Sequence, residues 1–86
     1  MEACLDPVER AILEKLYRHG YIGGRHTAEE NVQKGFPSHL RGELKHALKR
    51  LIREGYIVPK ITSYGRHISL NPSRIKEIES LIAPQE

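Results

Sequence analysis

The sequence predicts a small α+β domain, because its hydrophobic periodicity changes once along the chain. Up to Gly55 apolar residues recur at the spacing of one helix face, and after Gly55 they alternate at a period of about two. Two alternating segments flank a turn at residues 62–65, which predicts a β-hairpin, and Asn71-Pro72 then opens a last helix. The 86 residues contain no repeat and no linker-like tract, so we expect one domain over residues 1–86, with an ordered core over about 6–82.

The first helix is predicted to begin at Asp6, which supplies an N-cap acceptor. Pro7 is favourable as the first helical residue, and Glu9 places an acid at the third position. Gly20 can adopt the left-handed conformation that closes a helix, so the helix should end at His19-Gly20. Its inward face carries apolar residues at helical spacing, namely Leu5, Val8, Ile12 and Leu16, with Leu13 and Tyr17 at the margin.

The next segment is expected to contain a short strand and a short helix. Tyr21-Ile22 is an apolar pair between glycines, and we expect it to pair with the hairpin as a third strand. Thr27 and Glu30 match the capping-box pattern T-x-x-E, which predicts a helix from there to about Lys34. The run Gly35-Phe36-Pro37 should then turn the chain into the following helix.

The longest predicted helix runs from Pro37 to Gly55 and has two different faces. Cations four apart, such as Lys45 and Lys49, destabilise an isolated helix by roughly 0.2 to 0.5 kcal/mol per pair, and an anionic partner would relieve that repulsion. The apolar face should pack against a core and carries Leu40, Leu44, Ala47, Leu48 and Leu51, with Ile52 at its edge. The opposite face has no acid and carries His39, Gly42, His46, Lys49 and Arg53, flanked by Ser38, Lys45 and Arg50.

The basic residues are concentrated in one part of the chain. The whole chain has a net charge of +3, whereas residues 38–67 contain seven Lys/Arg against two acids, a net +5 that leaves −2 for the remainder. Such asymmetry within one domain indicates a localised basic surface and an anionic partner. A solvated face is the commoner role of charge on a single helix, so the helix alone does not decide the matter.

In the hairpin, Tyr56 to Ile61 should form the first strand and residues 66–70 the second. The alternation predicts that Ile68 and Leu70 face inward, and that His67 and Ser69 face outward. Pro59 cannot donate to a ladder, so its strand should lie at a sheet edge or be bulged. The last helix carries an apolar stripe, which either packs on the first helix or forms a homodimer interface: Ile75, Ile78, Leu81 and Ile82.

The order helix, short strand, helix, turn, helix, hairpin, helix resembles the winged helix-turn-helix family, and in particular small archaeal or bacterial transcription regulators. The resemblance covers about Asp6 to Ile82 and is carried by the T-x-x-E pattern, the cationic helix and the run REGYIVPKITSYGRHISLNP. It implies a three-helix core, a hairpin wing and a C-terminal helix, with the third helix in a DNA major groove and the wing on the backbone or adjacent minor groove. The DNA contacts that it implies are Ser38, His39, Arg41, Gly42, Lys45, His46 and Lys49 on the helix and Lys60, Ser63, Tyr64, Arg66 and His67 on the wing, to which the cationic stripe adds Arg50 and Arg53.

Some of these residues have two interpretations. Arg41 could fork onto guanine O6 and N7, or lie along the edge of the core and pair with an acid. Gly42 weakens a helix by roughly 1 kcal/mol relative to Ala, and it either permits close approach of a phosphate or another chain or is merely tolerated. His39 and His46 either donate to bases or phosphates, respond to pH near neutrality, or are simply exposed.

We therefore expect a double-stranded DNA-binding protein, sequence-specific or general, that acts as a transcriptional regulator. The alternative is a protein-interaction module of the same fold whose basic face binds an acidic partner, because fold alone does not determine function. RNA is less favoured, since Tyr64 is the one aromatic residue at a plausible contact point. A homodimer through the last helix would suit a palindromic DNA site.

Catalytic and metal-binding patterns are absent from the sequence, so neither an enzyme nor a metal or cofactor is expected. It contains no glycine-rich phosphate loop, nucleophile elbow or HExxH helix, and we attribute Glu30 to the capping box and Glu29 to solvent. His39 and His46 lie too far apart on a helix to share an ion, and the other histidines are scattered. The single cysteine, Cys4, excludes an internal disulfide, and no membrane span or signal peptide is recognisable, so a cytoplasmic protein is expected.

Overall fold

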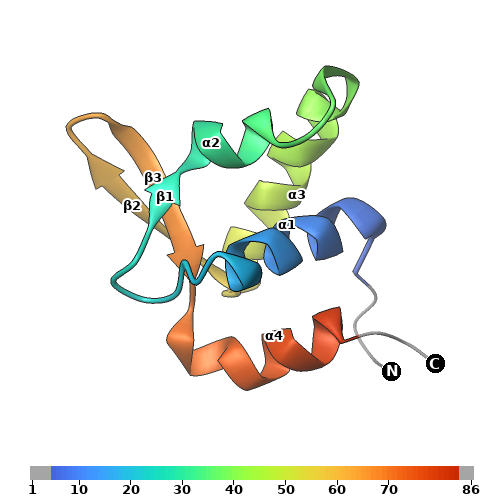
Figure 1. Cartoon of the computed structure of the whole chain (residues 1–86), viewed down its shortest axis with the longest axis vertical. Helices are drawn as coiled ribbons and strands as arrows, with labels where there is room; N and C mark the ends of the chain where they lie inside the picture. Colours follow the sequence, from blue (N-terminus) through green and yellow to red (C-terminus); the bar gives the residue numbers. More distant parts are fainter. Residues whose placement is uncertain (1–4, 84–86) are drawn as a thin grey trace.

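The computed structural model describes residues 5–83, which form four α-helices and a three-stranded antiparallel sheet (Figure 1). This architecture confirms the predicted α+β class, and Cys4 lies outside the described range. The helices are α1 (Pro7–Arg18), α2 (Glu29–Lys34), α3 (Arg41–Arg53) and α4 (Ile75–Ile82), with 3-10 turns at Ser38–Leu40 and Pro72–Arg74 before α3 and α4. The strands are β1 (Thr27–Ala28), β2 (Ile57–Thr62) and β3 (Gly65–Leu70).

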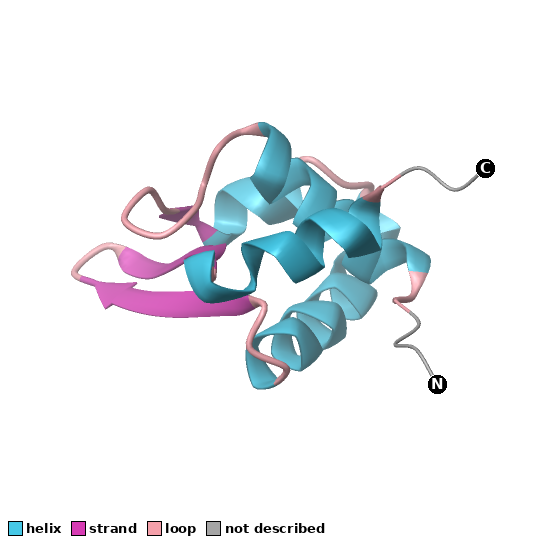
Figure 2. Ribbon diagram, turned by 90° about the horizontal axis from the view of Figure 1, so that it is seen from below, coloured by secondary structure: helices cyan, strands magenta, loops and turns pink. Residues whose placement is uncertain are grey.

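The hairpin of β2 and β3 projects from one side of the helices in both ribbon views (Figures 1 and 2). The strand order is β1-β3-β2, so β3 is central and β2 is an edge strand. Pro59 lies in β2 opposite Ile68, which confirms the predicted edge position for a residue that cannot donate to a ladder. The hairpin turn at residues 62–65 also lies where the sequence predicts it, because Thr62 is paired with Gly65.

Helix α1 begins and ends at the predicted residues. The Asp6 carboxylate accepts from the backbone N–H groups of Val8 and Glu9 at 2.8 and 3.1 Å, and the Glu9 carboxylate accepts from the Asp6 N–H at 3.0 Å. These bonds complete a capping box. At the other end Gly20 has a φ of 72°, and Gly55 closes α3 in the same way with a φ of 88°. Glycine is favoured at both positions because other residues rarely adopt this conformation.

The predicted start of α2 is wrong. Thr27 is a buried residue of β1, paired with Ile68, and α2 begins at Glu29 without a side-chain cap. The T-x-x-E pattern does not form a capping box, because Ala28 occupies the N-cap position of α2 and Thr27, one residue earlier, belongs to β1. The third strand is therefore β1 instead of the predicted Tyr21-Ile22, whose second residue makes a single parallel bridge with Leu70.

Two further predictions need correction. Ser69 is buried instead of facing outward, because the loop after α1 covers it and its hydroxyl donates to the Gly23 carbonyl oxygen at 3.0 Å. The helix predicted from Pro37 to Gly55 is α-helical only over α3, and its first residues form the 3-10 turn Ser38–Leu40. A 3-10 turn has three residues per turn, so the directions of its side chains differ from those on an α-helix.

The hydrophobic core lies between the helices and one face of the sheet. The predicted apolar face of α3 is confirmed, since its four central members are buried. Leu13 of α1 was expected at the margin of the core and is instead fully buried, at 0% exposure. The core residues are Ile12, Leu13, Leu16, Val32, Leu44, Ala47, Leu48, Leu51, Tyr56, Ile57, Ile68, Leu70 and Ile78.

The apolar stripe of α4 packs against the core of its own chain. Ile78 is fully buried, and Ile75, Leu81 and Ile82 are partly buried against the same core. Arg10 of α1 ties the end of α4 through a hydrogen bond from its Nη2 to the Ala83 carbonyl oxygen at 2.7 Å. Packing within one chain thus accounts for the stripe, and a homodimer through it stays an untested prediction.

Candidate functional site

The exposed side of α3 carries four cations that have no acidic partner among residues 5–83. They are Arg41, Lys45, Lys49 and Arg53, all exposed. Burial of the opposite face sets the rotation of the helix and so turns these side chains outward. Because they stand four apart, consecutive cations repel each other along the whole helix. Within residues 5–83, no acidic side chain pairs with these four cations to offset their mutual repulsion.

The other predicted contact residues at this helix are exposed as well. Ser38 and His39 lie in the 3-10 turn that precedes α3, and Gly42 and His46 lie on α3 itself. Arg41 has no ion-pair partner among the described residues, so the arrangement in which it pairs with an acid at the core edge is not found there. This leaves the Arg41 guanidinium on the outer surface.

A shallow groove of about 370 Å³ runs between α3 and the sheet. Its lining residues come from three elements, so the fold brings together side chains that are far apart in the sequence. Helix α3 contributes most of them and β3 contributes Arg66. The complete lining is Glu29, Gly42, Lys45, His46, Lys49 and Arg66.

Glu29 forms an ion pair with Arg66 at the edge of this groove. The Arg66 Nε donates to Glu29 Oε1 at 2.6 Å. Hydrogen bonding to Glu29 is the main cause that raises the pKa of Arg66 above its ordinary value, whereas burial acts in the opposite direction. The expectation that solvent accounts for Glu29 is therefore wrong. No sequence signal indicates this pair, because its partners lie 37 residues apart.

The hairpin tip holds three exposed contact candidates in a fixed turn. The Thr62 hydroxyl donates to the Gly65 carbonyl oxygen at 2.8 Å and accepts from the Tyr64 N–H at 3.1 Å. Tyr64 is 93% exposed, and nearby Ile61 is 78% exposed. These two hydrogen bonds fix the backbone of the turn from which the exposed Tyr64 side chain projects. Lys60 and Ser63 are exposed beside it.

His67, the remaining hairpin candidate, contacts His26. Their Nδ1 atoms are 2.8 Å apart, and the ring centroids are 4.8 Å apart at 68°. A hydrogen bond between these atoms requires one ring to carry its proton on Nδ1 and the other ring to accept it. The sequence interpretation of these histidines as scattered is wrong, because pairing of Ala28 with His67 brings the residue before β1 next to β3.

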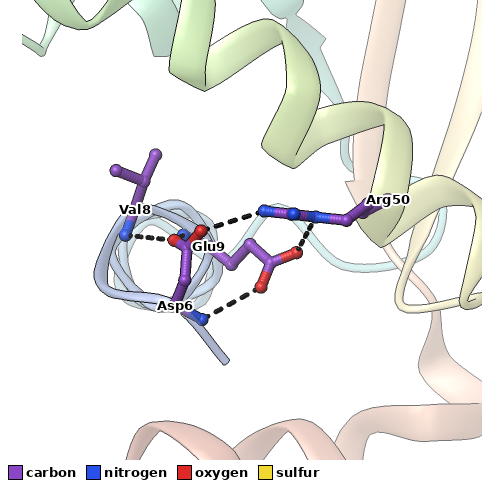
Figure 3. A network of polar contacts seen from close by, with 4 residues as sticks. All are labelled: Asp6, Val8, Glu9 and Arg50. Atoms are coloured by element: carbon purple, nitrogen blue, oxygen red, sulfur yellow. Dashed lines mark hydrogen bonds and ion pairs between the residues drawn. The ribbon is translucent and has the colours of Figure 1, made fainter. Parts of the chain in front are cut away.

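The Arg50 side chain extends from α3 toward α1 and contacts two acids there (Figure 3). Its Nε donates to Glu9 at 2.8 Å and its Nη2 to Asp6 at 2.9 Å. Hydrogen bonding and then the charge of Glu9 raise the pKa of Arg50 above its ordinary value. Among residues 5–83, Arg50 and Arg66 are thus the two predicted contact residues that form ion pairs, whereas the four outer cations of α3 form none.

Two other kinds of site are not formed by the part of the chain that the structure describes. Residues 5–83 contain no group of three or more His, Cys, Asp or Glu side chains arranged to hold a metal ion. None of the helices in this range combines the length and apolar character that crossing a bilayer requires.

The cationic surface combines the outer side of α3, the groove beside it and the fixed hairpin tip. Its function has to be inferred from its own charge and shape, because comparison with known proteins found no family model, no curated protein and no solved structure that matches the chain.

Proposed function

We propose that this chain is a winged helix-turn-helix protein that binds double-stranded DNA and regulates transcription. The order of elements supports the fold: α2, a short connection and α3 form the helix-turn-helix, and the β2–β3 hairpin that follows forms the wing. In this arrangement α3 enters the major groove and the hairpin reaches the neighbouring backbone or minor groove.

The observation that carries the proposal is the row of unpaired cations on α3. Arg41, Lys45, Lys49 and Arg53 repel each other and have no acid to balance them among residues 5–83. A row of phosphates would convert this repulsion into attraction and release condensed counterions. The thirteen residues of α3 span roughly 20 Å at 1.5 Å per residue. An α-helix with its side chains is about 10 to 12 Å in diameter, which suits a major groove about 12 Å wide.

The exposed residues divide into two roles under this proposal. Ser38, His39 and Arg41 lie at the N-terminal end of the helix, which is the end that contacts base edges when such a helix enters the major groove. Arg41 can form a bidentate contact with guanine, because its guanidinium has no ion-pair partner in the part of the chain that the structure describes. Lys49 and Arg53, farther along the helix, contact phosphates and contribute affinity for any sequence.

Duplex DNA of random sequence tests the proposal directly. Fluorescence anisotropy should detect binding at about 50 mM salt and much weaker binding at about 200 mM, with a slope of about −0.9 in log K for each phosphate contacted. An acidic peptide labelled in the same way is the control for attraction by charge alone. Equal binding of peptide and duplex favours the protein-interaction alternative, and absence of duplex binding at low salt contradicts the proposal.

A further inference from the structure

One ion pair stands in the groove between α3 and the sheet. Glu29 is the one acid among the six residues that line this groove, and it accepts a hydrogen bond from Arg66 at 2.6 Å. The side chains of Glu29 and Arg66 are 17% and 41% exposed, so water screens the pair only in part. A charge-assisted hydrogen bond that is partly shielded is stronger than the average ion pair on an open surface.

The backbone fixes both partners of this pair. Glu29 is the first residue of α2 and follows β1 directly, and β1 pairs with β3 so that Ala28 lies opposite His67, the neighbour of Arg66. The two side chains therefore start from positions that strand pairing holds together. The same two residues also line a second hollow between α2 and the hairpin tip, so the pair lies between the two hollows.

We infer that Glu29 withholds Arg66 from DNA, so that the guanidinium of Arg66 contributes no phosphate contact when a duplex binds to α3. This inference rests on the proposed function. A guanidinium whose charge is already balanced by a carboxylate releases no counterion from DNA and adds nothing to the salt-dependent affinity. Glu29 thereby limits the sequence-independent part of binding and leaves recognition to the base-edge contacts of α3.

The salt dependence of binding separates this arrangement from the opposite one. If Arg66 left Glu29 and bound a phosphate in the complex, this phosphate contact would already contribute to the wild-type slope of log K against log salt concentration. If Glu29 keeps Arg66, the contact appears only when the carboxylate is removed. The slope of log K against log salt concentration therefore reports where the Arg66 charge is used.

The decisive comparison is between Glu29→Gln and Glu30→Gln. Both remove one negative charge from adjacent residues of α2, but Glu30 is exposed and forms no ion pair among residues 5–83. For E29Q we expect a slope steeper by about 0.9, so that its affinity advantage over wild type is about 3.5-fold larger at 50 mM than at 200 mM salt. E30Q should retain the wild-type slope, and the double variant E29Q/R66Q should return to it.

Each remaining outcome decides the inference. Equal slopes for E29Q and E30Q overturn it while leaving the proposed function intact, whereas absence of duplex binding by every variant at low salt overturns both. If thermal unfolding shows that E29Q does not fold, Arg66→Gln alone decides the matter. An unchanged slope in R66Q supports the withheld arginine, and a slope shallower by about 0.9 overturns it.

Discussion

Gly42 is a residue of α3 for which the fold itself provides no reason. It is exposed, its φ is not positive, and a Cβ atom built on it would meet no heavy atom within 4 Å. The Gly42→Ala substitution should therefore raise the free energy of unfolding, but by less than the roughly 1 kcal/mol that separates the two residues in a helix interior, because Gly42 is only the second residue of α3. If a DNA backbone packs on α3 at this point, the same methyl group should weaken duplex binding. Urea unfolding and anisotropy measure the two effects.

Gly24→Ala is the matched control for this prediction. Gly24 is likewise exposed, has no positive φ and leaves open space around a built Cβ atom, but it lies in the loop before β1 and outside the groove. The Gly24→Ala substitution should therefore leave the affinity for duplex DNA unchanged. Tighter or equal duplex binding by G42A would mean that Gly42 is merely tolerated and that no partner approaches the helix backbone there.

At the scale of elements, the Asp6 carboxylate at the start of α1 should make the free energy of unfolding depend on pH in the acid range. Burial alone would raise the pKa of the Asp6 carboxyl, but hydrogen bonds from the Glu9 and Val8 N–H groups and from Arg50 outweigh it and lower this pKa below its ordinary 3.8. A lowered folded-state pKa means that ionised Asp6 stabilises the fold fully above the unfolded-state value. That contribution is lost as the pH falls through the folded-state pKa.

Asp6→Asn isolates this effect, because asparagine also caps helices but carries no charge. As the pH falls below about 4, the free energy of unfolding should fall more steeply in the wild-type protein than in D6N. Urea unfolding at a series of pH values measures both slopes. Parallel curves would show that the Asp6 carboxylate contributes nothing by its charge and that the cap acts through its hydrogen bonds alone.

The elements that could be predicted from the sequence are those whose signals are local. The cap at Asp6 and the glycine at position 20 each act on residues within one turn, and the structure contains both. Strand β1 could not be predicted, because T-x-x-E is a local pattern, whereas the partner of Thr27 is Ile68. The alternation within β3 likewise predicts that Ser69 faces outward, but a loop from elsewhere in the chain covers it.

At the scale of the whole molecule, the candidate site also combines features that follow from local sequence patterns with features that depend on residues far apart in the chain. Helical periodicity predicts that Lys45, Lys49 and Arg53 face outward, because a single amphipathic helix determines which side chains do so, whereas it leaves Arg41 open between the outer surface and the core edge. The Glu29–Arg66 and His26–His67 contacts could not be predicted, since both depend on the pairing of β1 with β3. Arg50 stands at the boundary between the two faces of α3, where periodicity alone cannot assign it to the core side or the outer side.

Lys49 and Arg50 are adjacent cations, and the structure assigns them to different sides of the molecule. Lys49 lines the groove and has no ion pair among residues 5–83, whereas Arg50 contacts Glu9, whose side chain is only 9% exposed, and Asp6 (Figure 3). Arg50→Gln should lower the free energy of unfolding by about 1 to 3 kcal/mol, because it leaves the Glu9 carboxylate without its charged partner. Lys49→Gln should change it by less than about 0.5 kcal/mol.

Duplex binding should show the reverse pattern for the same two variants. Lys49→Gln removes an unbalanced charge from the outer row, so the slope of log K against log salt concentration should become shallower by about 0.9. Arg50→Gln should keep the wild-type slope, because Asp6 and Glu9 already balance the Arg50 charge. If R50Q instead flattens the slope and leaves stability unchanged, Arg50 belongs to the DNA-contacting surface and its two ion pairs give way when the duplex binds.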